Sequence, residues 1–100
     1  MKTIIQETDG KITAILSGEL DTAAAEETEK ALQPLLCSKG KEIVLDCTEL
    51  EYISSSGLRV LLSILKQAKA VGSRVVLKNV NEVIRDVLDI SGFISIFEFE

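Results

Sequence analysis

The chain has 100 residues, of which 46% are hydrophobic and 27% charged, and its net charge of −5 gives an isoelectric point near 4.7. This length suits one domain with a single core, and the composition is that of a globular protein. The negative charge argues against nucleic acid or an anionic membrane surface as a partner, because both attract basic proteins. The apolar runs are too short to span a bilayer, and the N-terminus is not patterned as a signal peptide.

Few residues are suited to catalysis or metal binding. The chain contains no histidine, and Cys37 and Cys47 do not have the spacing of a metal site. We therefore expect no metal, no cofactor and two free thiols in a reducing cytoplasm. The sequence does not exclude a catalytic Ser–Lys pair. Lys66 and Lys69 lie two or more helical turns beyond the serine cluster at 54–56, however, so they would not reach it easily. With no glycine-rich phosphate loop either, an enzyme is not expected.

The chain begins with a predicted β-hairpin. Strands are expected at residues 3–8 and 11–17, joined by Asp9-Gly10, a typical two-residue turn of type I′. In the second strand every other residue is apolar, which predicts a half-buried antiparallel pair. These inward residues are Ile12, Ala14 and Leu16.

A break at residues 18–22 leads into the first predicted helix, which extends to about residue 38. Asp21 or Thr22 is expected to cap it. Pro34 should either bend this helix or separate its last turn, because proline cannot continue the hydrogen-bond pattern of a helix interior. The expected buried stripe comprises Ala25, Ala31, Leu32, Leu35 and Leu36.

After a turn at residues 38–41, the run Ile43-Val44-Leu45 predicts a strand at 42–47 that is covered on both faces. A short surface loop then leads to the serine cluster and Gly57. From Leu58 onwards, apolar residues recur at helical spacing. One serine is expected to cap this second helix, but three hydroxyls are more than capping needs.

The last third of the chain repeats the alternation of strand and helix. Residues 71–73 should stop the second helix, and 74–77 should form a strand. Asn79 is expected to cap a third helix in a capping box with Glu82, and Ser91-Gly92 to end it before a final strand at 94–99. The predicted buried face of this helix comprises Val80, Val83, Ile84, Val87 and Leu88.

The predicted element order is therefore β-β-α-β-α-β-α-β. Strands separated by helices imply right-handed crossovers, so we expect a single α/β domain over residues 1–100 with a mixed, mostly parallel sheet. In such sheets binding surfaces tend to form at the carboxyl ends of the strands. Acidic residues that follow two of the strands, among them Asp21 and Asp46, could form a solvated rim or a protein-binding surface there.

The whole chain resembles a STAS domain, and within that family the bacterial anti-sigma-factor antagonists. The resemblance rests on the hairpin and on three segments in order. These are Gly18-Glu19-Leu20-Asp21, Leu45-Asp46-Cys47-Thr48 and Ser55-Ser56-Gly57-Leu58. Where the family has an aspartate before its serine pair, this chain has Ser54. The chain stops at Glu100, whereas many members of the family continue into a last helix.

The resemblance implies a cytoplasmic regulator that is switched by phosphorylation of Ser55, or less favourably of Ser54 or Ser56. The kinase would be a cognate anti-sigma factor, and a PP2C-type phosphatase would remove the phosphate. Only the unphosphorylated form would bind the anti-sigma factor and so release the sigma factor. The partner surface would include Asp21, Asp46, Thr48, Ser54, Ser56 and Gly57.

Two alternatives stay open at this stage. One is a small STAS subunit of a lipid or anion transport complex, in which the same surface grips an ATPase and no kinase acts. The other is a small-ligand or nucleotide sensor with its ligand at the strand ends, although no phosphate-binding glycine loop supports it.

Overall fold

The computed structural model describes residues 1–8, 10–37 and 41–100. Asp9 of the hairpin turn, residues 38–40 of the predicted turn at 38–41, and the side chains of Leu36 and Cys37 lie outside the described part. The strands are β1 Lys2–Thr8, β2 Lys11–Leu20, β3 Glu42–Ile53, β4 Arg74–Lys78 and β5 Glu98–Phe99. The helices are α1 Thr22–Leu32, α2 Ser55–Ala70 and α3 Glu82–Ile90, with short 3-10 helices at Gln33–Cys37 (η1) and Ile94–Ile96 (η2).

The five strands form one sheet in the order β1-β2-β3-β4-β5. The β1–β2 pair is antiparallel and the other three pairs are parallel, so the predicted mixed, mostly parallel α/β fold is confirmed. The hairpin is confirmed as well, because Thr8 pairs with Lys11 across two intervening residues and Gly10 has the left-handed φ of +73°.

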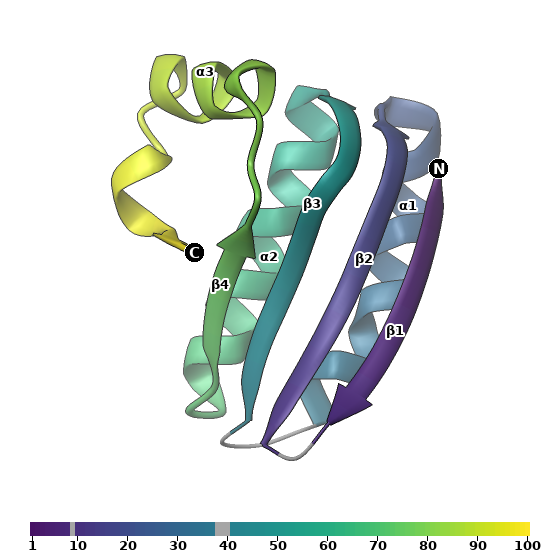
Figure 1. The fold of residues 1–100 in the computed structure, drawn as a ribbon, viewed down its shortest axis with the longest axis vertical. Coiled ribbons are helices and arrows are strands. Elements are labelled where there is room, and N and C mark those ends of the chain that lie inside the picture. The colour runs from purple at the N-terminus through teal and green to yellow at the C-terminus, as the bar shows by residue number, and fades with distance from the viewer. Residues whose placement is uncertain (9, 38–40) are drawn as a thin grey trace.

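Helices α1 and α2 lie on one side of the sheet, and α3 lies at its end (Figure 1). The core lies between this side of the sheet and the helices, and its side chains are at most 8% exposed. It includes Ile12, Ala14, Leu16, Leu20, Ile43, Leu45, Leu61, Ile64, Leu77, Ile84 and Leu88. The run Ile43-Val44-Leu45 of β3 is buried as predicted, at 0%, 2% and 0% exposed, although α1 and α2 lie on only one side of the sheet (Figure 1).

The predicted break at residues 18–22 and the predicted loop after Cys47 were wrong. Strands β2 and β3 continue to pair up to Leu20 and Ile53. The two strands stay paired over this length because their register shifts at two places. Gly18, which lies next to one of these shifts, has a φ of +100°. Because each irregularity disturbs the two-residue alternation, this stretch does not show the pattern of a regular strand.

Pro34 separates the last turn of the first helix, as predicted: α1 ends at Leu32 and the 3-10 helix η1 follows. Within the predicted stripe, Ala25, Leu32 and Leu35 are buried and Ala31 is half-buried. Helix α2 ends as predicted, because the amide of Ser73 donates to the carbonyl of Ala68 at 2.9 Å around Gly72.

The third helix starts two residues later than predicted. Its cap is Asn81, whose side chain accepts a hydrogen bond from the amide of Ile84 at 2.9 Å. Asn79 instead takes a left-handed φ of 56° and donates through its amide side chain to the Thr48 hydroxyl. Val83 was expected to be buried, but it is 54% exposed.

The predicted last strand is mostly not a strand. Phe93 donates its amide to the carbonyl of Leu88 at 2.9 Å, and Ile96 donates to Phe93 at 3.2 Å, so the chain first closes a short 3-10 helix. Only Glu98 and Phe99 pair with β4. This stretch is apolar because its side chains pack against the rest of the domain, and not because it forms a long strand.

Candidate partner-binding site at the serine cluster

Strands β2 and β3 end side by side and lead directly into α1 and α2. Leu20 and Ile53 are a pair in the register, and Asp21 and Ser54 follow them as the caps of the two helices. The Asp21 carboxylate accepts a hydrogen bond from the amide of Ala24 at 2.9 Å. Two helix N-termini, each with free amides and a positive dipole end, therefore lie at one end of the sheet (Figure 1).

Ser54 uses its hydroxyl for two structural hydrogen bonds. Its Oγ accepts from the amide of Gly57 at 3.0 Å and donates to the carbonyl of Leu20 at 3.2 Å. The amide of Ser54 donates to the same carbonyl at 2.9 Å. Ser54 therefore starts α2 and also ties it to the end of β2.

Gly57 allows α2 to lie very close to β2. A Cβ atom at this position would lie 2.5 Å from the carbonyl oxygen of Leu20 and 3.1 Å from a side-chain carbon of Ile53. These distances are shorter than van der Waals contact, and the first of the two atoms belongs to the backbone. Position 57 therefore requires glycine, because there is no room for a Cβ atom.

Ser55 and Ser56 keep their hydroxyls free of protein hydrogen bonds among the described residues. Ser55 is exposed at the first position of the 16-residue helix α2, and Ser56 is half-buried. Ser56 and Arg59 line a groove of about 390 Å³ between α1 and α2. Arg59 lies one helical turn after Ser55, so both side chains emerge on the same side of α2. Arg59 was missed as a candidate, although this spacing is visible in the sequence.

Acidic side chains surround the start of α1. Glu19, Asp21, Glu27 and Glu51 line a hollow of about 440 Å³. Glu51 comes from β3 and Glu19 from β2, so the hollow extends across the ends of both strands. The surface next to the serine cluster is therefore negatively charged.

Asp46 and Thr48 are not part of this end of the sheet. Seven residues of extended chain separate Asp46 from Ser54, a span of roughly 25 Å. The Asp46 carboxylate accepts hydrogen bonds from the Thr48 amide at 3.0 Å and hydroxyl at 2.6 Å, and the Thr48 hydroxyl accepts one from Asn79 at 2.9 Å. Partial burial acts to raise the pKa of Asp46, but these bonds and the charge of Lys78 outweigh it and lower the pKa.

The sequence matches the STAS domain family over residues 2–100. This chain belongs to the STAS domain family. It is 40% identical over 97 residues to BtrV of Bordetella bronchiseptica, a candidate anti-sigma factor antagonist, covering 97% of this chain and 84% of the relative. It is 26% identical to the anti-sigma-B factor antagonist of Bacillus subtilis over 94 residues, covering 94% of this chain and 85% of that one.

Solved structures agree on the fold. The unphosphorylated form of the anti-sigma factor antagonist SpoIIAA superposes with a TM-score of 0.81, covering 99% of this chain and 88% of that chain. Its phosphorylated form from Bacillus gives a TM-score of 0.74, covering 99% and 91%. Both are 23% identical to this STAS domain.

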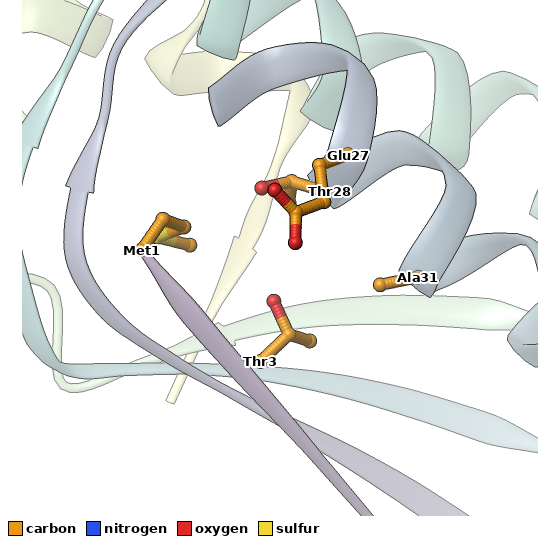
Figure 2. Close-up of a pocket in the computed structure, with 5 residues that line it drawn as sticks. All are labelled: Met1, Thr3, Glu27, Thr28 and Ala31. Atoms are coloured by element: carbon orange, nitrogen blue, oxygen red, sulfur yellow. The ribbon is translucent and has the colours of Figure 1, made fainter. Parts of the chain in front are cut away.

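A second, smaller hollow of this STAS domain lies away from the serine cluster. Figure 2 shows the side chains of Thr3, Glu27 and Thr28 around a crevice between β1 and α1, with Met1 and Ala31 at its sides. Its volume is about 120 Å³. In the described part of this STAS domain, no group of three or more metal-ligating side chains is placed to hold a metal ion. Among the described residues, no helix is long and apolar enough to cross a membrane.

We expect the first two serines of the cluster to differ in their effect on stability. Ser54→Ala should lower the free energy of unfolding by about 1–2 kcal/mol, because it removes the cap and a bond to Leu20. Ser55→Ala, at an exposed position, should stay within about 0.5 kcal/mol of the parent chain. Urea unfolding of the two variants measures the difference, and equal losses would contradict the assigned roles.

Cys47 is predicted to be chemically inert in the folded domain. Burial, together with the charge of Asp46, raises the pKa of the Cys47 thiol from 9.0 to about 12. The stabilisation that this proton provides is fully present below pH 9 and is lost as the pH rises toward 12. Urea unfolding at about pH 8 and about pH 10 should show this loss in a Cys37→Ser background, and Cys47→Ala should reduce it. An equal loss in Cys47→Ala would assign the alkaline effect to other groups.

Proposed function

We propose that this STAS domain is an anti-sigma-factor antagonist of the cytoplasm, which binds an anti-sigma factor through the surface around Ser55. The anti-sigma factor would also be a serine kinase, and phosphorylation of Ser55 would end the binding. A PP2C-type phosphatase would restore the active form. The identity of 40% with BtrV supports the class of function.

The observation that carries the proposal is the difference between the three serines. The Ser54 hydroxyl is used in hydrogen bonds with Leu20 and Gly57, and the Ser56 side chain is half-buried. Ser55, in contrast, is exposed and has a free hydroxyl. A kinase can reach Ser55 without breaking a bond of the fold. Ser54 caps α2 at the position where the family has an aspartate, and serine and aspartate cap helices equally well.

A phosphate on Ser55 would be well placed electrostatically within its own domain. It would lie at the N-terminus of α2, where the dipole and free amides favour an anion. Arg59, one turn further on, could pair with it. The fold would therefore tolerate the modification. A partner that packs on the bare hydroxyl would instead meet extra bulk and about two negative charges.

The other predicted partner residues divide into two groups. Asp21, Ser54 and Ser56 lie around Ser55 at the ends of β2 and β3, and we propose that they form the contact surface with it. Gly57 was also predicted to contact the partner, but it is buried against Leu20 and Ile53 and is not part of this surface. Asp46 and Thr48 lie further back along β3, where the Thr48 hydroxyl donates to Asp46 and accepts from Asn79. Their part in partner binding stays a prediction and would require a second patch.

The test is phosphopeptide mapping by mass spectrometry on the chain purified from its own cells, before and after phosphatase treatment. We expect one phosphate, on Ser55, that phosphatase removes. A phosphate on Ser56 would retain the switch but contradict the assigned acceptor. No phosphate under any growth condition would contradict the switch and favour a STAS subunit that is not controlled by a kinase.

A further inference from the structure

The outer face of α3 carries two parallel rows of side chains. Val83, Val87 and Ile90 form one row at the spacing i, i+4, i+7, which places them along one side of the helix. Val83 is 54% exposed and Ile90 is 88% exposed, while Val87 is half-buried. Glu82, Asp86 and Asp89 form a second row at the same spacing, displaced by one residue. We call the two rows the apolar row and the acidic row.

The two exposed members of the apolar row, Val83 and Ile90, are not needed to hold α3 in place, whereas Val87 packs partly against the core. Ile84 and Leu88 are fully buried and attach the helix to the core. The helix is also well closed at both ends, by the Asn81 cap and by the bond from the Phe93 amide to Leu88. The exposure of Ile90 is therefore a property of an ordered helix. Single exposed apolar residues are common, but an aligned row beside charged residues is typical of a helix that docks into a groove.

The charges indicate what kind of surface would cover the row. Arg85 is the one basic residue within α3, and its guanidinium lies 4.7 Å from the centre of the Phe99 ring, on the other side of the helix from Val83. Arg85 lies three residues after Glu82 and four before Asp89, so it borders the acidic row on the helix surface. Three acidic side chains then face a single basic one on this helix, and the row stays net negative. A second copy docked on the same face would bring two acidic rows together, which like-charge repulsion disfavours. A partner with an apolar groove and lysine or arginine along one rim fits both rows.

Helix α3 also lies close to the surface proposed above. It is at the same end of the sheet as the beginnings of α1 and α2 (Figure 1). Its cap Asn81 donates to the carbonyl of Leu50 at 2.8 Å, in the part of β3 that leads to Ser54. A single partner could therefore contact the serine cluster and α3 together.

We propose that the outer face of α3 is a second contact surface for the anti-sigma factor, which would receive the apolar row in a groove with a basic rim. This inference rests on the proposed function. It adds a contact that phosphorylation of Ser55 does not touch, so the two surfaces should contribute separately to affinity.

The test uses the anti-sigma factor encoded in the same genome as the probe and measures its binding by isothermal titration calorimetry. The double variant Val83→Gln with Ile90→Gln removes the apolar row while keeping good helix formers. Asp86→Lys reverses a charge in the acidic row. Ile4→Thr is the matched control, because Ile4 is 39% exposed on β1 at the far edge of the sheet. Circular dichroism and urea unfolding establish that all variants fold.

We expect the double variant to bind at least tenfold more weakly, and Asp86→Lys to weaken binding and reduce its dependence on salt, while Ile4→Thr binds like the parent. If the α3 variants bind normally while Ser55→Asp does not, the inference fails and the proposed function stands. If the parent chain itself does not bind the anti-sigma factor, both fail. A dimer of the parent chain that the double variant abolishes, seen by analytical ultracentrifugation, would assign the row to self-association and overturn the proposal.

Discussion

Replacing Gly57 with alanine is expected to lower the free energy of unfolding by about 2–3 kcal/mol, the upper part of the range usual for overpacking a closely fitted site. The new methyl group would lie 2.5 Å from the Leu20 carbonyl oxygen, which belongs to the backbone and cannot rotate away. Either α2 must move outward or β2 must shift. Elsewhere in a helix the same substitution stabilises by up to about 1 kcal/mol, so the sign of the effect is itself diagnostic.

The measurement is urea unfolding of Gly57→Ala beside Gly72→Ala as the matched control. Gly72 has open space around it but a φ of +78°, so its loss should reflect backbone conformation alone, about 1 kcal/mol. A Gly57→Ala variant as stable as the parent chain would show that the close approach of α2 to β2 is not required.

The second large effect concerns binding. Ser55→Asp should weaken binding of the anti-sigma factor by about 100-fold, or ~2.7 kcal/mol, and full phosphorylation should weaken it further. The reason is that a charged group would replace a neutral hydroxyl on a surface already lined by Asp21 and Glu51. The fold should be retained, because the new charge lies at the positive end of the α2 dipole and one turn from Arg59.

Calorimetric titration measures the affinity, and far-ultraviolet circular dichroism measures the fold. Gln6→Glu is the matched control, since it adds one negative charge at an exposed position on β1. Ser55→Ala should bind like the parent but no longer respond to the kinase. If Gln6→Glu weakened binding as much as Ser55→Asp, the effect would be one of net charge and not of the site. A collapsed dichroism spectrum for Ser55→Asp would contradict the idea that the helix tolerates the charge.

The element order and the sheet type were predictable from the sequence, because each depends on local patterns. Alternation in β2 and helical spacing after Leu58 mark buried faces directly. Pro34 predicted where the regular helix α1 ends, because proline cannot continue the hydrogen-bond pattern of a helix interior. The errors occur where tertiary contacts override such patterns. The polar residues from Thr48 to Glu51 resemble a loop, yet they belong to β3 because β2 continues to pair beside them.

At the site, the serine cluster was visible in the sequence but the roles within it were not. All three serines are acceptable caps, and Ser54 is distinguished by the bond that it accepts from the Gly57 amide and by its bond to Leu20, 34 positions earlier. For the same reason Asn79 and Asn81 could not be ranked as caps of α3. Asn79 is held by Thr48 of a neighbouring strand, which is a contact between distant parts of the chain.

The order of the strands across the sheet is also their order along the chain. A ribosome releases the N-terminal hairpin first, and each later strand then finds its partner at the free edge left by the one before it. No strand has to be inserted between two that are already paired, and no early segment must wait for the C-terminus. Assembly during translation can therefore proceed from one edge of the sheet to the other, with α1 and α2 packing on one face of the strands that they connect.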